Sequence, residues 1–203
     1  MRLNADLISK TQQYLNPMNQ FYIDLRGYKI PYLENLAATN DQFECVDLTE
    51  NDIARLEELP KLQRLETLML ANNKVAVVEA DFAEMCPKLD SLILTNNRLS
   101  RFEDIDMLAT CRSLQRLSLI GNMVCNLPNY RLYTIHMMQG LRVLDFQMVS
   151  RGEREMARKL YATDDAPVEA LEGEQNTSSV AATKVVAQEE EESGAAQQAP
   201  VAM

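Results

Sequence analysis

The chain has 203 residues, of which 46% are hydrophobic and 25% are charged, and its formal net charge at pH 7 is −10. This length supports one domain with a sizeable core plus an appendage. No apolar run approaches the roughly 20 residues that span a bilayer, and the start of the chain, MRLNADLISK, lacks the apolar centre of a secretory signal. We therefore expect a protein of the cytoplasm or nucleus, without a membrane-bound or secreted form.

The negative charge is concentrated at the C-terminal end of the sequence. Residues 163–203 contain nine acidic residues and one lysine, whereas the other 162 residues contain 21 acids and 19 bases. The folded part is therefore nearly neutral, and the overall charge does not exclude contact with RNA.

The residues that carry out catalysis or bind metals are sparse. The four cysteines, at 45, 86, 111 and 125, form no C-x-x-C pair, and His136 is the only histidine, so zinc-ligand spacing is absent. Neither G-x-x-x-x-G-K-[ST] nor G-x-G-x-x-G occurs. We expect reduced, mostly buried thiols, a His136 packed within the fold, no metal, no cofactor and no enzymatic activity.

The first predicted element is a short helix over residues 4–15, within an N-terminal cap over residues 1–19. Asn4 is a suitable N-cap residue, and Pro17 lies beyond the expected end of the helix. Four residues would share one helical face: Leu7, Ile8, Thr11 and Leu15.

Residues 20–128 repeat one pattern. Three segments superpose almost residue for residue: LETLMLANNKV at 65–75, LDSLILTNNRL at 89–99 and LQRLSLIGNMV at 114–124. With weaker copies on both sides, the second apolar position falls at residues 23, 46, 68, 92, 117 and 144. The common pattern, L-x-x-L-x-L-x-x-N-x-L, is the leucine-rich repeat. It predicts an α/β solenoid of about six repeats with one parallel, concave sheet and helical or 3₁₀ returning segments.

One asparagine recurs where each strand ends. An amide both donates and accepts hydrogen bonds, so it can satisfy backbone groups of adjoining turns. We expect a structural ladder of four such residues: Asn51, Asn73, Asn97 and Asn122.

Residues 129–161 have a different spacing of aromatic and aliphatic residues and are predicted to form a C-terminal cap that ends in a helix over about 151–160. Arg151, Arg154 and Arg158 would share one face of this helix, with Lys159 beside them. This face is either a salt-bridged surface or a contact for nucleic acid. Residues 162–203, acidic and without aromatic residues, are predicted to be a disordered tail.

The residues between the buried positions of each strand point outward, and such a surface is the natural binding site of a solenoid. Met69, Ile93 and Ile120 make its middle apolar, and its ends are charged, an arrangement that favours a protein partner. The predicted row comprises Tyr22, Asp24 and Arg26; Cys45, Asp47 and Thr49; Thr67, Met69 and Ala71; Ser91, Ile93 and Thr95; Arg116, Ser118 and Ile120; and Val143, Asp145 and Gln147.

Three segments are more specific than the repeat: DLRGYKIPYLENLAATNDQFECVDLTENDI at 24–53, LILTNNRL at 92–99 and YRLYTIHMMQGLRVLDFQMVSRGER at 130–154. They resemble the A-prime family of the U2 small nuclear ribonucleoprotein, a component of the spliceosome, over about residues 1–161. The tail departs from this resemblance, because family members often have a longer basic region after the cap.

The resemblance implies a nuclear, non-catalytic scaffold that works with other spliceosome proteins. Its concave sheet would bind a helix of an RRM protein, the B-double-prime subunit, and the pair would bind a hairpin of the U2 RNA. Under this resemblance, RNA contacts fall at Arg26, Lys29 and Arg151. Partner contacts fall at Tyr22, Asp24, Arg26, Asp47, Thr49, Met69, Ile93, Thr95 and Arg116.

A second hypothesis is a regulatory leucine-rich repeat protein. Phosphatase regulators and acidic nuclear phosphoproteins share the repeat, and a protein of this type would dock on an enzyme or a chromatin factor with help from the acidic tail. Co-purifying proteins and RNA would distinguish the two hypotheses.

Overall fold

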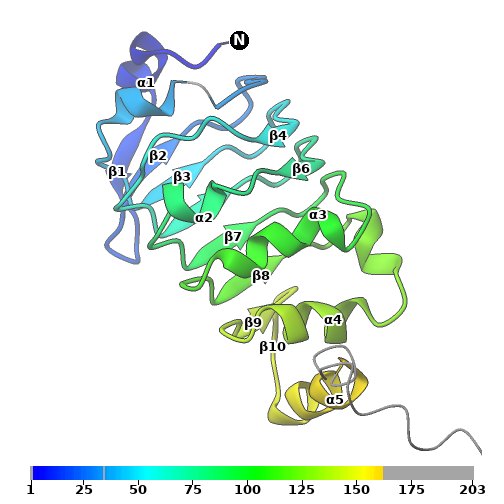
Figure 1. Cartoon of the computed structure of the whole chain (residues 1–203). Coiled ribbons are helices and arrows are strands. Elements are labelled where there is room, and N and C mark those ends of the chain that lie inside the picture. Colours follow the sequence, from blue (N-terminus) through cyan, green and yellow to red (C-terminus); the bar gives the residue numbers. More distant parts are fainter. Residues whose placement is uncertain (1, 34, 162–203) are drawn as a thin grey trace, which may run out of the picture. The chain divides into compact units, whose positions relative to one another are not determined.

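Eight strands form one continuous sheet in the structure, a computed structural model that describes residues 2–33 and 35–161 (Figure 1). The six central strands run parallel, and a short antiparallel strand closes each edge. The tail predicted for residues 162–203 lies outside the described residues. In order across the sheet, the strands are β1 (Gln13–Leu15), β2 (Phe21–Asp24), β3 (Cys45–Asp47), β5 (Thr67–Met69), β7 (Ser91–Ile93), β8 (Arg116–Ser118), β9 (Val143–Leu144) and β10 (Gln147–Met148).

The register of the parallel strands is the one that the repeat predicts. Each coil places its second apolar residue beside that of the next coil, and all six are at most 3% exposed. Burying these side chains in one continuous core is what holds coil to coil. The aligned residues are Ile23, Val46, Leu68, Leu92, Leu117 and Leu144.

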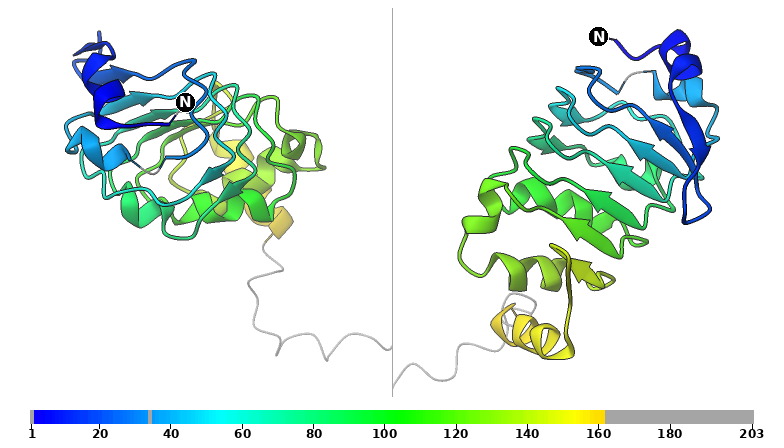
Figure 2. Two further views of the ribbon diagram at one scale, coloured as in Figure 1. Left: turned by 90° about the horizontal axis from the view of Figure 1, so that it is seen from above. Right: turned by 180° about the vertical axis from the view of Figure 1, so that it is seen from behind.

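The returning segments cover one face of the sheet and leave the other face open (Figure 2). They have the short helical and 3₁₀ character that the sequence predicts. They comprise η1 (Leu36–Thr39), α2 (Phe82–Met85), α3 (Glu103–Asp106), η2 (Met107–Thr110) and η3 (Met123–Asn126), together with a two-stranded sheet of β4 (Arg55–Leu56) and β6 (Val77–Val78).

The four repeat asparagines are buried and bridge neighbouring coils. The Nδ2 group of Asn73 donates to the carbonyl oxygens of Leu48, at 2.9 Å, and Leu70, at 3.1 Å, while its Oδ1 accepts the backbone N–H of Ile53, at 3.1 Å. One amide thus satisfies backbone groups on both sides of its own turn. Asn51, Asn97 and Asn122 make the same three kinds of bond.

The N-terminal helix is shorter than predicted. Asn4 caps α1 (Ala5–Lys10) by accepting the N–H of Leu7, as expected, but the helix ends at Lys10 and the chain then forms β1. Leu15 is accordingly 64% exposed and does not lie on a buried helical face. The prediction was wrong because it used only local periodicity, whereas β1 pairs with the open edge of β2 and satisfies its backbone groups.

The C-terminal cap consists of α4 (Tyr130–Met137), the β9–β10 hairpin and α5 (Arg151–Tyr161). The chain turns sharply at Asp145 and Phe146, which both have positive φ, at 53° and 60°. In the earlier coils, the N–H after each strand donates to a backbone carbonyl of the next coil, as Leu94 N–H does to Ser118 O. After β8, the carboxylate of Asp145 takes this role by accepting the N–H of Leu119, at 2.7 Å, and it also accepts the hydroxyl of Tyr130, at 3.0 Å. A side chain thereby satisfies the backbone N–H that follows β8.

Candidate partner-binding surface

The open side of the sheet, called the concave face below, is built from three rows of outward residues. Strand pairing aligns the first two rows, and backbone bonds beyond the strand ends keep the third in register, such as Gly27 N–H to Thr49 O at 3.0 Å and Asn72 N–H to Thr95 O at 2.9 Å. The rows are Tyr22, Cys45, Thr67, Ser91, Arg116 and Val143; Asp24, Asp47, Met69, Ile93 and Ser118; and Arg26, Thr49, Ala71, Thr95 and Ile120.

The centre of the concave face carries three apolar side chains that are at least partly exposed. Met69 and Ile93 are register partners on adjacent strands and are partly exposed, and Ile120 is 42% exposed. Thr95 lies beside them, and its hydroxyl is hydrogen-bonded to that of Ser118 at 2.9 Å. Because this polar pair is satisfied internally, the centre presents mainly carbon atoms, which suits the apolar side of a helix.

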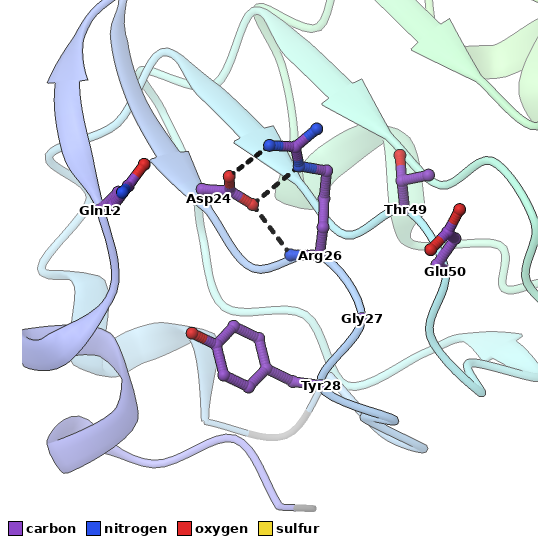
Figure 3. A pocket seen from close by; sticks show the side chains of 7 residues that line it. All are labelled: Gln12, Asp24, Arg26, Gly27, Tyr28, Thr49 and Glu50. Carbon is purple, nitrogen blue, oxygen red and sulfur yellow. Dashed lines mark hydrogen bonds and ion pairs between the residues drawn. The ribbon is translucent and has the colours of Figure 1, made fainter.

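The N-terminal end of the face carries a cluster of charges (Figure 3). The Arg26 guanidinium donates to both carboxylate oxygens of Asp24, at 2.9 Å and 2.6 Å, and its Nε lies 3.6 Å from Asp47. Asp47 accepts the hydroxyl of Tyr22, at 2.8 Å, and the N–H of Thr49, at 2.9 Å. The fork-like pairing fixes the orientation of an otherwise long and mobile side chain.

The pKa values in this cluster follow from these contacts. The hydrogen bonds from Arg26 lower the pKa of Asp24. Burial, followed by the hydrogen bond to Asp47, raises the pKa of Tyr22 well above its usual range. At neutral pH, Asp24 is thus charged and Tyr22 is a neutral donor.

Two predicted contact residues have little surface to offer. Tyr22 is 7% exposed and Asp47 is 5% exposed, because Tyr14 packs against Tyr22, with ring centroids 4.8 Å apart, and Arg26 lies over Asp47. Their expected position in the outward rows is correct, but they support Arg26 more than they form a surface themselves. Alternation along a strand gives the direction of a side chain and does not reveal what covers it.

An open hollow of about 550 Å³ lies beside this cluster. Arg26 and the half-buried Thr49 both line this hollow. The carboxylate and amide groups of its lining are suited to the basic or polar end of a ligand. Its lining consists of Gln12, Asp24, Arg26, Gly27, Tyr28, Thr49 and Glu50 (Figure 3).

At the C-terminal end of the face, Arg116 is paired with Asp90 and its side chain is 44% exposed. The predicted outward position of Gln147 is wrong, because the turn at 145–146 reverses the strand, so that Gln147 pairs with the buried Leu144. Met148 takes its place beside Val143 and is 81% exposed.

Two exposed residues, one on each edge strand, were not among the predicted contacts. Tyr14 pairs with Tyr22 and is 44% exposed, and Met148 pairs with Val143. For Tyr14, the Asn-Pro turn signal that follows QYL could have suggested a hairpin. No such signal precedes Met148.

The three residues expected to contact RNA do not converge. Arg26 and Lys29 are exposed in the first coil, whereas Arg151 begins α5 at the opposite end of the repeats, where its side chain is 94% exposed and lies 3.3 Å from Glu155 (Figure 1). Arg154 is only partly exposed, because its guanidinium donates to the carbonyl oxygens of Gln139 and Leu141.

Three of the four cysteine thiols are buried in the core of the described residues. Burial raises the pKa of the Cys45 and Cys86 thiols to about 12 and that of Cys111 to about 11, so these groups are poor nucleophiles. Within residues 2–33 and 35–161, no three His, Cys, Asp or Glu side chains are grouped to hold a metal ion. None of the helices in this part of the chain has the length and apolar character to cross a membrane.

An ion pair between Arg131 and Glu153, called the clamp below, joins α5 to α4 within the C-terminal cap. Arg131 of α4 donates to Glu153 at 2.6 Å, and Glu153 also accepts the N–H and hydroxyl of Ser150, both at 2.8 Å. Glu153 N–H donates back to the Ser150 hydroxyl at 3.2 Å, which completes a capping box at the start of the helix. The Arg131 hydrogen bond is the largest of the effects that lower the pKa of Glu153 to about 2.

Glu153→Gln should destabilise the protein by about 2 kcal/mol at pH 7, after allowing for partial solvent screening. The pKa of Glu153 is lowered from 4.5 to about 2 on folding. Its contribution is therefore present above about pH 4.5 and is lost as the pH falls towards 2. Urea unfolding of the variant and the wild type from pH 7 to pH 2.5 should show a difference that shrinks on acidification. Glu155→Gln, at the exposed pair, should cost under about 0.5 kcal/mol, and an equal cost at the two sites would contradict the clamp.

Comparison with known proteins places this chain in a family. A leucine-rich repeat family model matches residues 1–172. U2 small nuclear ribonucleoprotein A' of Arabidopsis thaliana is 46% identical over 169 residues, which cover 83% of this chain and 68% of that protein. The Homo sapiens protein of that name is 44% identical over 161 residues, which cover 79% of this chain and 63% of that protein. The chain thus spans about two thirds of the length of these curated relatives.

A solved structure agrees in fold and in sequence. A chain of the Drosophila melanogaster SNF/U2A' complex has a TM-score of 0.78 and 41% identity, over 79% of this chain and 92% of that chain. The agreement extends across the repeats, and the sequence identity is too high for a likeness of fold alone. The chain is therefore a spliceosomal leucine-rich repeat protein and belongs to the U2 small nuclear ribonucleoprotein A' family.

Proposed function

We propose that the protein is a non-catalytic scaffold of the nuclear U2 small nuclear ribonucleoprotein in pre-mRNA splicing. Its concave face binds a helix of an RRM protein of the B-double-prime type, and the pair binds a hairpin of the U2 RNA. The observation that carries this proposal is the apolar centre of Met69, Ile93 and Ile120 between the Arg26 cluster and Arg116.

The dimensions of the face support a helical occupant. Adjacent strands of a sheet are about 4.8 Å apart, so the five strands from β2 to β8 span roughly 19 Å. A helix of about 13 residues has the same length, at 1.5 Å per residue. One amphipathic helix would therefore cover the apolar centre and reach the charges at both ends.

The charges support a fixed orientation of that helix. Carboxylates dominate the N-terminal end of the face, at Asp24 and Glu50, whereas Arg116 lies towards the C-terminal end. A helix with a basic side chain over the first group and an acidic one over Arg116 would be favoured over the reverse orientation. Asp24, Arg26 and Thr49 would meet one end of the helix, and Thr95 would lie under its middle.

The comparisons support a protein partner, because the related Drosophila melanogaster protein was solved in a complex with SNF. RNA contact by this chain would be secondary to that of its partner. Arg26 and Lys29 at one end and Arg151 at the other are the proposed contacts, and their separation suits flanking contacts on an RNA held mainly by the RRM protein.

A binding assay tests the proposal. The full chain and a purified RRM protein of the B-double-prime type are expected to elute together in size-exclusion chromatography at a 1:1 ratio. The mixture should bind the U2 hairpin more tightly than either protein alone. Separate elution at micromolar concentrations would contradict the proposal.

A further inference from the structure

A small pocket lies between α4 and α5, in the cap and not on the concave face. Its volume is about 100 Å³, which corresponds to roughly three water molecules in the liquid and accommodates a group of phosphate size. It is lined by Ile135, His136, Gln139, Arg154, Ala157 and Arg158.

Two arginines give the pocket positive charge. Arg154 and Arg158 are four residues apart on α5 and therefore share one face of the helix. Arg154 donates to two carbonyl oxygens, which hold its guanidinium in place and leave its charge uncancelled. Arg158 is exposed and has no ion pair within the described part of the chain.

The acidic residues of α5 are engaged elsewhere. Glu153 is bound to Arg131 at 2.6 Å, and Glu155 lies 3.3 Å from Arg151. They pair with other arginines and do not line the pocket. The positive charge of the pocket is thus available to an anion.

The remaining walls add an imidazole and two apolar side chains. The ring of His136 is held near that of Tyr161, with centroids 5.2 Å apart, and an imidazole can offer an N–H donor. Ile135 and Ala157 are 2% and 1% exposed and form an apolar floor. Two guanidinium groups beside an imidazole N–H donor are suited to binding the oxygens of a phosphate.

We propose that this pocket binds a backbone phosphate of RNA. The inference rests on the proposed function, in which the protein and its RRM partner bind RNA together. A polyanion is favoured over a single phosphorylated side chain because the exposed Lys159, next to Arg158, continues the positive charge along α5 outside the pocket. RNA that crosses the cap would contact several of these groups in succession.

The chain carries its own reporter for this site. His136 is its only histidine, so in a complex of labelled full chain with unlabelled RRM partner the imidazole NMR signal reports on the pocket directly. The U2 RNA hairpin should shift this signal in the wild type and leave it unchanged in Arg158→Glu. Lys10→Glu, the same charge change at an exposed site in α1, should retain the shift.

Affinity for the hairpin gives the second readout. Arg158→Glu should weaken binding about tenfold and reduce the slope of log affinity against log salt by about one, while Lys10→Glu should change neither. An Arg158→Glu complex with wild-type affinity and a shifted His136 signal would overturn the pocket alone. A Lys10→Glu variant that weakens RNA binding as much as Arg158→Glu does would also overturn it. So would a His136 signal that shifts with a phosphopeptide but not with the hairpin. A wild-type complex that does not form, or does not bind RNA, would instead overturn the proposed function.

Discussion

Ile93→Asp should lower the affinity for the RRM partner at least about 100-fold while the protein stays folded. Ile93 lies at the centre of the concave face, between Met69 on β5 and Ser118 on β8. A partner helix would seal this position from water, and an aspartate there would be buried without a counter-charge. The loss should exceed the effect of Ile93→Ala, which removes contact area without adding charge.

The measurement is a titration of labelled partner with each variant, accompanied by thermal unfolding. Val77→Asp provides the matched control, because Val77 is a 36% exposed β-branched residue of β6, outside the concave sheet. It should bind the partner as the wild type does. Near-normal binding by folded Ile93→Asp would show that the partner docks elsewhere.

Asn73→Leu should lower the free energy of unfolding by about 3–5 kcal/mol. Leucine has a similar size but cannot bond to the backbone, so the buried N–H of Ile53 would lose its partner. The carbonyls of Leu48 and Leu70 would each lose one of their two amide donors. Because Asn73 connects the turns of successive coils, its loss should loosen the stack on both sides.

Urea denaturation checks this prediction through a lower midpoint at an unchanged m-value. Asn126→Leu is the control, since Asn126 is exposed, and its cost should be within about 0.5 kcal/mol. A similar small cost at Asn73 would mean that water or a shifted backbone replaces the ladder bonds.

The repeats could be predicted because their signal is periodic and their neighbours are alike. Ile23, Leu68 and Leu117 are buried at the predicted register, since each coil packs against a coil of the same shape. A wrong register would have turned every leucine to solvent, so the pattern permits a single solution.

The ends of the repeats could not be predicted in the same way. β1 exists because β2 would otherwise leave an open edge, and the turn at Asp145 exists because no further coil follows. Both features depend on neighbours that a local pattern does not reveal. The Ser150-x-x-Glu153 capping box is a local pattern, but it was not among the predictions.

The candidate site was predicted in direction but not in exposure. Ile93 and Thr95 lie on the concave face and are partly exposed, whereas Tyr22 and Asp47 point the same way and are covered by other side chains. Likewise, helical spacing placed Arg154 beside Arg158 correctly but did not show that carbonyl oxygens hold it. Burial of a side chain by residues distant in sequence is a tertiary property.

Purification of the tagged chain from nuclear extract, read for both RNA and protein, tests the central claim most directly. A U2 scaffold should bring down U2 RNA together with an RRM protein in near-equal amount, and Ile93→Asp should lose both. An eluate dominated by a phosphatase or by histones, without U2 RNA, would contradict the account and favour a regulatory leucine-rich repeat protein.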